Sequence, residues 1–422
     1  MARWSWLAVV LAILVQAQPH ADDVYHDRYA NGGAWESRVK GILDVSRVAV
    51  RGGPFLAVPA GASFEPVDLK VNDLGYSALG YAWGKVFGRP LNRRLLMGIN
   101  LGLLLVALLA LLALTPPGPR LAVVAVLLLV PIPVPAYRSP DPLATHGSLL
   151  LLGVVIAASA SRRWPIWVHA LLGGALFAVY TIRSAYAFYG ASALLAVAVV
   201  ECLRTRARAP LLRALVVLGV AIALNLAWQV PLARRAADPR IVQQDALGTH
   251  PVYIPLLEGV GWSENRWGIK PWDPWVATYL GERFHLDPVD VGTKESERRA
   301  RQTYRELWME APLHLMGVYL SRVPQAVREH AFGGLAGAVG LLLALPLALL
   351  VTWRRKDPLL FALLVAATTL TACVAFQTIV LDPRLLYAYP LRLASALTLA
   401  FSASVLVDLA RWPRAAGSAP VN

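Results

Sequence analysis

Long apolar segments, separated by shorter polar ones, dominate the hydropathy pattern of this chain. A helix needs about 20 apolar residues to cross a bilayer, and about ten segments come close to that length. These segments cover residues 4–21, 97–115, 121–137, 142–160, 164–182, 185–203, 211–230, 331–353, 358–381 and 391–410. Leu, Ala and Val run through them without the apolar–polar alternation of a transmembrane β-barrel. The pattern predicts an all-α integral membrane protein of about ten transmembrane helices.

The first of these segments has two interpretations. Met1-Ala2-Arg3 followed by an apolar run to Ala17 is typical of a cleaved signal peptide, but it also fits a retained helix. We expect the helix to be retained, because the charge pattern of the remaining segments is then consistent.

Basic residues fall mainly on one side of the predicted spans. If the N-terminus is cytoplasmic, the segments on that side carry Arg120, Arg162, Arg163, Arg204, Arg206, Arg208, Arg213, Arg354, Arg355, Lys356, Arg411 and Arg414. The short loops on the other side carry only Arg138, Arg183, Arg384 and Arg392. Cytoplasmic loops are enriched in Lys and Arg, so we predict a multi-pass protein of a cell membrane, such as the bacterial inner membrane, with both termini cytoplasmic. The asymmetry also accounts for the net charge of +14, so we expect the lipid bilayer as a partner and no nucleic acid.

Two long hydrophilic segments then lie outside the cytoplasm. The predicted division of the chain is a first helix at 1–21, a loop at 22–96, helices two to seven at 97–230, a second loop at 231–330, helices eight to ten at 331–410 and a tail at 411–422. The chain contains no Walker loop, nucleotide-binding fingerprint or paired-cysteine metal motif, which argues against a nucleotide-driven transporter.

Both long loops contain apolar and aromatic residues in patterns that predict structure. From Gly75 to Met97, apolar residues recur at helical spacing, which predicts an amphipathic helix leading into the second span. The second loop carries Trp262, Trp267, Trp272 and Trp275. These tryptophans are either interface anchors or the lining of a site for a sugar or a lipid head group.

Three aspartates are candidates for catalysis on the outer side. Asp22 and Asp23 follow the first span in the string ADDVYHDRYA, and Asp141 precedes the fourth span in RSPDPLATHG. A carboxylate at the membrane boundary can accept a proton from an attacking hydroxyl or bind a divalent cation. The alternative is a solvated loop cap for the pair and an ordinary helix start for Asp141. His146 is a further candidate, as a proton carrier or hydrogen-bond donor.

Two arginines at outer span ends are candidates for binding an anion. Arg183 lies in TIRSAYAFYG, and Arg384 lies in LDPRLLYAYP beside Tyr387. A guanidinium binds phosphate oxygens with two parallel hydrogen bonds, whereas the alternative for both residues is snorkelling to the interface. Acids and arginines on one side fit a transferase whose donor is a sugar on a lipid phosphate.

This arrangement resembles the GT-C superfamily of polyprenyl-phosphate-dependent glycosyltransferases. The closer likeness is to the branch of protein O-mannosyltransferases and lipid A aminoarabinose transferases, and it covers about the first 190 residues. An acidic pair follows the first helix in DDVYHDRYA, then come GYSALGYAWGKVFGRPLNRRLLMGIN and SPDPLATHGSLLLL. Two features depart from the family: the chain is shorter than most members, and the pair is Asp-Asp where Asp-Glu is common.

The resemblance implies a membrane glycosyltransferase, a hexosyl- or pentosyltransferase that moves a sugar with inversion from a polyprenyl-phosphate donor to a lipid, glycan or protein acceptor. By position, it implies Asp22 or Asp23 as the base and Asp141 as a supporting or metal-contacting acid. Arg183 and Arg384 would contact the phosphate, and a divalent cation is an open requirement. Two alternatives stay open: a ligase or polymerase of surface polysaccharide, and a membrane transporter or lipid flippase.

Overall fold

The structure is a computed structural model. It describes residues 34–67, 74–116, 119–120, 122–124, 140, 145–242, 251–271, 273–285, 293–355, 357–381 and 385–416. Helices make up nearly all of these residues. One antiparallel hairpin is the departure from the predicted all-α class in the described part of the chain: β1 (Ala57–Ala60) pairs with β2 (Ser63–Pro66).

The chain is a multi-pass membrane protein. Six helices are long and apolar enough to cross a bilayer. They are α5 (Arg93–Leu114), α10 (Ser184–Thr205), α11 (Ala209–Ala236), α17 (Gly334–Arg355), α18 (Pro358–Val380) and α19 (Leu385–Ala416). Two shorter apolar helices, α8 (His146–Ala158, extended by η3, Ser159–Ser161) and α9 (Ile166–Ile182), match two further predicted spans. The predicted span 4–21 lies outside the described residues, as does most of 121–137, so the number ten stays a prediction.

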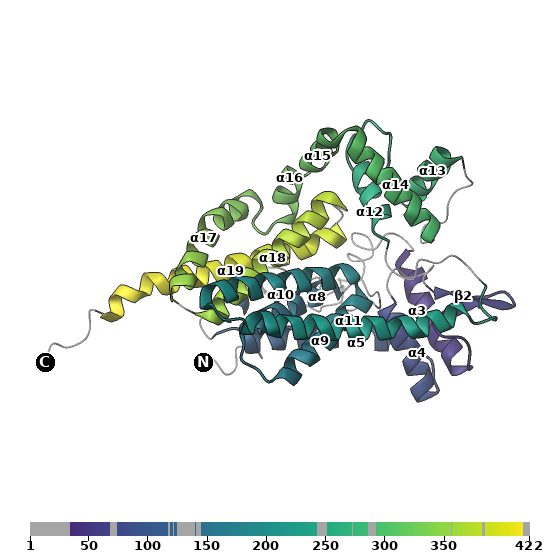
Figure 1. Ribbon diagram of the computed structural model, residues 1–422, viewed down its shortest axis with the longest axis horizontal. Coiled ribbons are helices and arrows are strands. Elements are labelled where there is room, and N and C mark those ends of the chain that lie inside the picture. The colour runs from purple at the N-terminus through teal and green to yellow at the C-terminus, as the bar shows by residue number, and fades with distance from the viewer. Residues whose placement is uncertain are drawn as a thin grey trace.

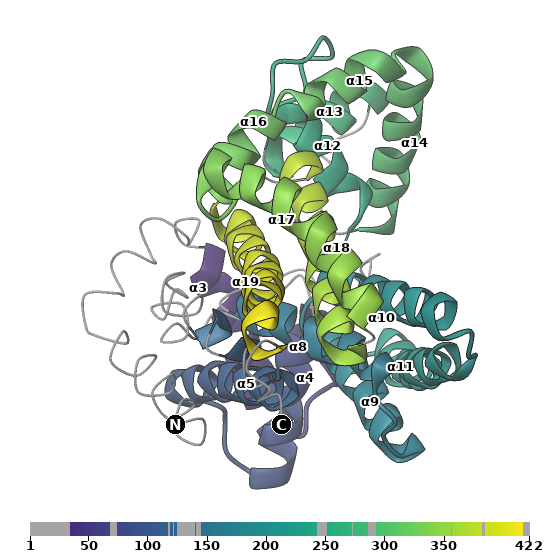
Figure 2. The same cartoon turned by 90° about the vertical axis from the view of Figure 1, so that its left-hand side faces the viewer.

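Helix α8 lies in the middle of the bundle, and Figure 2 shows it surrounded when the bundle is viewed along its length. Nearly all of its residues are buried, because α5, α10, α18 and α19 pack around it. Gly153 of α8 and Gly190 of α10 let these two backbones approach closely. The outer helices differ: Leu342 on α17 and Ile222 on α11 are 75% and 60% exposed, as expected of side chains that face lipid tails.

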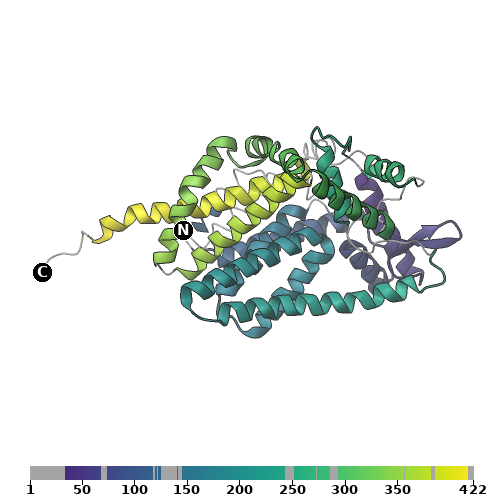
Figure 3. The same ribbon diagram turned by 45° about the horizontal axis from the view of Figure 1, so that its top comes forward.

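The segment that precedes the second span folds into a unit at one end of the bundle. We call it the N-terminal unit: α3 (Ala34–Val50), the β1–β2 hairpin and α4 (Gly75–Phe87). It is joined to the end of α11, because Phe64 forms a parallel bridge with Ile241 and Arg235 donates to the carbonyl of Leu56 at 3.4 Å. Figure 3 shows α11 running the length of the bundle to reach the hairpin.

The predicted amphipathic helix from Gly75 to Met97 is two helices. Helix α4 ends at Phe87, Gly88 has a left-handed backbone (φ +61°), and α5 begins at Arg93 with Asn92 as its N-cap. Arg89 follows Gly88 and precedes Pro90, and the residue before a proline disfavours a helical backbone. The chain therefore turns between the unit and the second span.

Two glycines form the face of α4 that packs on α3. Gly80 and Gly84 press against α3, with an added Cβ at Gly84 falling 2.5 Å from the carbonyl oxygen of Ser46. Large apolar side chains of α4 point outward, and Val86 is 73% and Phe87 53% exposed. An outward apolar face on a helix that leads directly into a span is the composition expected at the membrane interface.

A second group of helices precedes α17. We call it the four-helix lobe: α12 (Tyr253–Gly261), α13 (Asp273–Phe284), α14 (Lys294–Glu310) and α15 (Pro312–Leu320). The short α16 (Val323–Gln325) and the π-helix η4 (Ala326–His330) lead from the lobe into α17. Figure 1 shows the lobe and the N-terminal unit at the same end of the bundle.

One buried arginine attaches the lobe to the bundle. Arg322 donates to the hydroxyl of Ser263 at 2.9 Å, to the carbonyl of Ile379 at 2.9 Å and to the carbonyl of Gly259. The Ile379 and Gly259 carbonyls belong to the C-terminal turns of α18 and α12, where helices leave carbonyls short of partners, and the Gly259 carbonyl also accepts from the N–H of Trp262 at 3.4 Å. A single guanidinium therefore connects two helix ends.

Candidate functional site

Arg183 forms the whole connection between two helices. α9 ends at Ile182 and α10 begins at Ser184, so Arg183 is the one residue between them. Its backbone is extended (φ −157°, ψ 101°), its N–H donates to the carbonyl of Val179 at 2.8 Å, and its side chain is buried. The arginine is therefore held at a fixed place, at the bundle end that carries the N-terminal unit and the lobe.

His146 lies close to this turn, at the start of α8. Its imidazole contacts the ring of Tyr186, with ring centroids 5.0 Å apart, and both side chains are almost fully buried. Tyr186 stands three residues after Arg183, on the first turn of α10. The close approach of α8 and α10 at their glycines explains why the two rings meet.

A tyrosine and a glutamine extend this group toward α18. Tyr186 packs edge-on against Tyr189 at a centroid distance of 5.6 Å, and the Tyr189 hydroxyl donates to Oε1 of Gln377 at 3.0 Å. The Tyr189 phenol also lies within electrostatic range of Arg183. Three helices thus contribute to one buried polar group, which we call the bundle-end cluster: His146, Arg183, Tyr186, Tyr189 and Gln377.

The N-terminal unit covers the edge of this cluster. Gly75, the first residue of α4, lies against the last turn of α9, where an added Cβ would come within 2.7 Å of the Thr181 carbonyl. The next residue, Tyr76, donates a buried hydrogen bond from its hydroxyl to Asn100 of α5. The start of α4 is therefore fixed against Thr181, which is two residues before Arg183 in the sequence.

The other predicted site residues are not all within the described part of the chain. Asp22, Asp23, Asp141 and Arg384 lie outside the described residues, so their roles stay predictions. Tyr387 lies in the first turn of α19, and its side chain is not described. Of the predicted residues, the structure places His146 against Tyr186, which stands three residues after Arg183.

Arg392, which the sequence places beside Arg384, has a partner of its own. It donates to the carbonyl of Glu329 at 2.6 Å, at the end of the π-helix that precedes α17. This contact links α19 to the connection between lobe and bundle, which is a structural role.

Tyr186, Tyr189 and Gln377 are the members of the cluster that sequence reasoning did not assign to a site. Tyr186 follows Arg183 by three residues, which places it one helical turn further along α10. Gln377 is an amide in an otherwise apolar helix, and polar side chains inside a span almost always face the protein interior. Both signals are present in the sequence, but only the packing of α10 against α18 joins them.

The cluster supplies hydrogen-bond donors and a positive charge. A buried guanidinium with nearby imidazole and phenol groups can bind the oxygens of a phosphate. The cluster contains no carboxylate, so a general base would have to come from another segment. Among the described residues, no group of three or more His, Cys, Asp or Glu side chains is placed to hold a metal ion.

Comparisons with models of protein families, with curated proteins and with solved structures find no match for this chain.

Proposed function

We propose that the protein is a membrane glycosyltransferase that takes a sugar from a polyprenyl-phosphate donor. The observation that supports this most is the bundle-end cluster: a buried arginine at the end of a membrane-spanning bundle, one helical turn before the tyrosine that contacts His146 and two residues after the contact of α9 with the N-terminal unit. The phosphate of a lipid-linked donor lies at the membrane surface, where the end of a membrane-spanning bundle is also expected.

The proposed reaction is an inverting displacement. An acceptor hydroxyl oxygen bonds to the anomeric carbon while the bond from that carbon to the donor phosphate oxygen breaks, and polyprenyl phosphate leaves. The hydroxyl proton passes to a carboxylate, for which Asp22 or Asp23 is proposed and Asp141 assists. Arg183, together with Arg384, Tyr387 and His146, would stabilise the negative charge on the leaving phosphate.

The test of the phosphate role is Arg183→Lys, with Arg163→Lys at the opposite end of the bundle as the matched control. Lysine keeps the charge but loses the planar fork. We expect donor use to fall about tenfold or more with normal membrane insertion, because a hydrogen bond to a charged group contributes about 1.5–3 kcal/mol. Wild-type kinetics for Arg183→Lys would assign the side chain to packing instead.

The proposed base is tested by Asp22→Asn and Asp23→Asn, with Asp27→Asn as the control. Loss of general-base help costs about 10²–10⁴ in rate, so one of the two should be almost inactive while donor binding persists. Full activity in the double variant would contradict the mechanism.

Two further measurements decide orientation and substrate. Reporters fused after Arg208, after Lys356 and at the C-terminus should be cytoplasmic, and reporters near Glu65 and Glu264 should be outside. Analysis of lipid-linked glycans in cells that lack the protein should show one missing sugar and an accumulated polyprenyl-linked donor. Loss of whole polymer chains instead would favour the ligase or polymerase alternative.

A further inference from the structure

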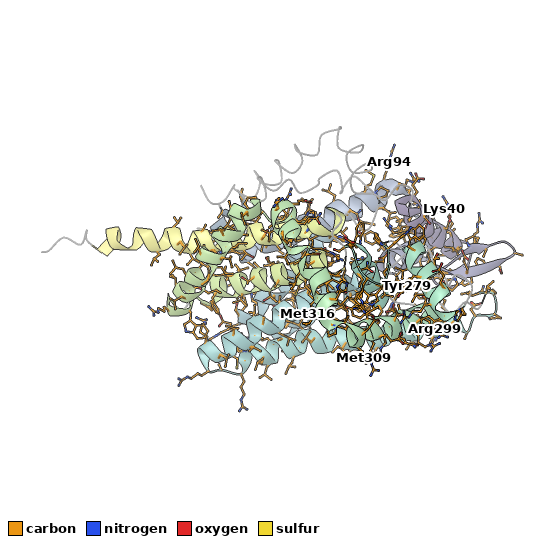
Figure 4. All side chains as sticks on the ribbon, turned by 90° about the horizontal axis from the view of Figure 1, so that it is seen from above. Lys40, Arg94, Tyr279, Arg299, Met309 and Met316 are labelled. Carbon is orange, nitrogen blue, oxygen red and sulfur yellow. The ribbon has the colours of Figure 1, made fainter. Side chains whose placement is uncertain are left out.

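The surface of the four-helix lobe has a shallow cavity, widely open to solvent, that the bundle-end cluster does not use. It has a volume of about 380 Å³ and is lined by Trp267, Tyr279, Glu282 and Arg283. Ligand pockets in proteins measure roughly 300–1,000 Å³, so this one has room for a small ligand or one or two rings of a larger one. Figure 4 labels Tyr279 on the lobe, at the same end of the molecule as Lys40 and Arg94.

The aromatic side of the cavity is held in place by neighbouring charges. The Trp267 indole N–H donates to Oε2 of Glu310 at 3.2 Å, and its ring meets His314 edge-on at 5.1 Å. The Tyr279 hydroxyl accepts from Nη1 of Arg283 at 3.3 Å. Two ring systems are thus fixed beside one cavity, before any ligand binds.

The polar side offers both a donor and an acceptor. Arg283 is fixed by an ion pair with Glu306 at 2.7 Å, which offsets its charge. The Glu282 carboxylate makes no hydrogen bond or ion pair within the described part of the chain and lines the cavity. The cavity therefore combines aromatic surface, N–H donors and a free carboxylate, with no excess positive charge.

From these contacts we infer that the cavity binds a neutral saccharide. Pyranose rings have apolar C–H faces that pack on aromatic rings, and hydroxyls that donate to carboxylates and accept from guanidinium groups. An acidic sugar is disfavoured, because its charge would meet Glu282 while Arg283 is already neutralised by Glu306. We assign this saccharide to the acceptor, an assignment that rests on the proposed function, whereas saccharide binding itself does not rest on it.

Binding is measured with the full chain in lipid nanodiscs by ligand-observed NMR titration. The probes are the methyl pyranosides of glucose, galactose, mannose and N-acetylglucosamine, the matching disaccharides, and methyl glucuronide as the acidic comparison. We expect at least one neutral probe to bind with millimolar affinity and more tightly than the glucuronide. If no neutral probe binds, the saccharide assignment is overturned.

Variants then locate the site. Tyr279→Ala should weaken binding about tenfold or more, and Tyr279→Phe should weaken it only about threefold, because the ring rather than the hydroxyl supplies most of the contact. Trp275→Ala is the matched control, since Trp275 is an exposed tryptophan of the same helix that does not line the cavity. Equal binding in Tyr279→Ala and wild type would place the sugar elsewhere and overturn the proposal.

A second variant covers the case in which Tyr279→Ala does not fold. Glu282→Gln removes the negative charge at the rim without changing size, so the preference for neutral over acidic probes should shrink severalfold. An unchanged preference would contradict the inferred role of Glu282. Saccharide binding without any sugar transfer would refute the glycosyltransferase proposal and leave the cavity assignment standing.

Discussion

The N-terminal unit and the four-helix lobe sit at the same end of the bundle but are held together by different interactions. The unit depends on close packing: α3 and α4 meet across glycines, and Phe55 packs edge-on against Tyr81 and against Trp228 of α11. The lobe has a hydrophobic core of its own, which includes Leu257 and Leu280, and adds ion pairs along its surface, among them Arg266–Glu310 at 2.5 Å and Arg283–Glu306 at 2.7 Å.

The two regions also differ in how they join the membrane helices. The unit runs into α5 by chain continuity, contacts α9 through α4, and contacts the C-terminal part of α11 through Phe55 and Leu56. The lobe contacts α18 mainly at its last residues, where Gly259 lies against the carbonyl of Val380 and Arg322 makes its hydrogen bonds. We therefore expect the unit to respond to changes of side-chain volume, and the attachment of the lobe to respond to loss of the hydrogen bonds of Arg322.

The largest expected effect is in the unit, for Gly84→Val. The new Cβ would fall 2.5 Å from the Ser46 carbonyl and 2.9 Å from the Ala49 side chain, so α3 and α4 would have to separate. Overpacking of this kind costs about 3 kcal/mol of unfolding free energy or more. Thermal unfolding in detergent measures it. Gly98→Ala is the control, because nothing lies within 4 Å of its added Cβ; equal unfolding temperatures for both would contradict the close packing.

The next largest effect is in the lobe, for Arg322→Met. Methionine keeps much of the side-chain volume but leaves the Ile379 carbonyl without the Arg322 donor, and it leaves the Gly259 carbonyl with only the N–H of Trp262 at 3.4 Å. An unsatisfied buried group costs about 1–3 kcal/mol each. We expect faster limited proteolysis within the lobe while the bundle stays protected. Arg305→Met, at an exposed position of α14, should change nothing, and a lobe that stays protected in both variants would exclude the attachment role of Arg322.

A smaller effect is expected for Glu297→Ala. The Glu297 carboxylate of α14 accepts from the backbone N–H groups of Val252 and Tyr253, at 2.7 and 2.9 Å, at the start of α12. Loss of such a cap costs about 1–2 kcal/mol. Hydrogen exchange at the first turn of α12 measures the change. Glu297→Gln should retain part of the protection, because its amide oxygen still accepts one bond; no difference between the two would count against capping.

The smallest effect is a pH dependence of the lobe. Hydrogen bonds from Arg298 and Arg299 lower the pKa of Glu295 from its ordinary value of 4.5 to about 2. A pKa that is lower in the folded state adds stability above pH 4.5, which is lost as the pH falls from about 4.5 to about 2. Glu295→Gln should flatten this part of the curve of unfolding temperature against pH. Glu264→Gln, at an exposed carboxylate, is the control, and an identical slope in both variants would contradict the assignment.

The spans could be predicted from the sequence because a long apolar segment in a bilayer must satisfy its own backbone hydrogen bonds, and a helix does so. α18 begins at Pro358 and ends at Val380, against a prediction of 358–381. The face of α4 could not be predicted in this way. Hydropathy favours burial of Leu79 and Phe87, but the surface that α3 offers fits only Gly80 and Gly84, and that surface is a property of the folded unit.

The candidate site could also be predicted only in part from the sequence. The position of Arg183 at a span end predicts a polar boundary, and the structure confirms that the residue ends α9. The hydrogen bond of Tyr189 with Gln377 joins residues 188 positions apart in the sequence, and patterns of neighbouring residues do not predict such a contact. The lobe cavity likewise combines Trp267, from the loop after α12, with side chains of α13.

The attachment of the lobe also sets an order for biosynthesis. Residues 251–320 are synthesised before residues 358–380, yet the lobe contacts Ile379 and Val380 at its base. During translation the ribosome therefore adds some sixty residues after the lobe before it reaches Ile379 and Val380. Until then the lobe lacks its contact with the end of α18. Arg322 and the carbonyl of Gly259 have no second helix to join until α18 has been made and inserted. Insertion of α18 is thus the step at which the lobe becomes part of the bundle.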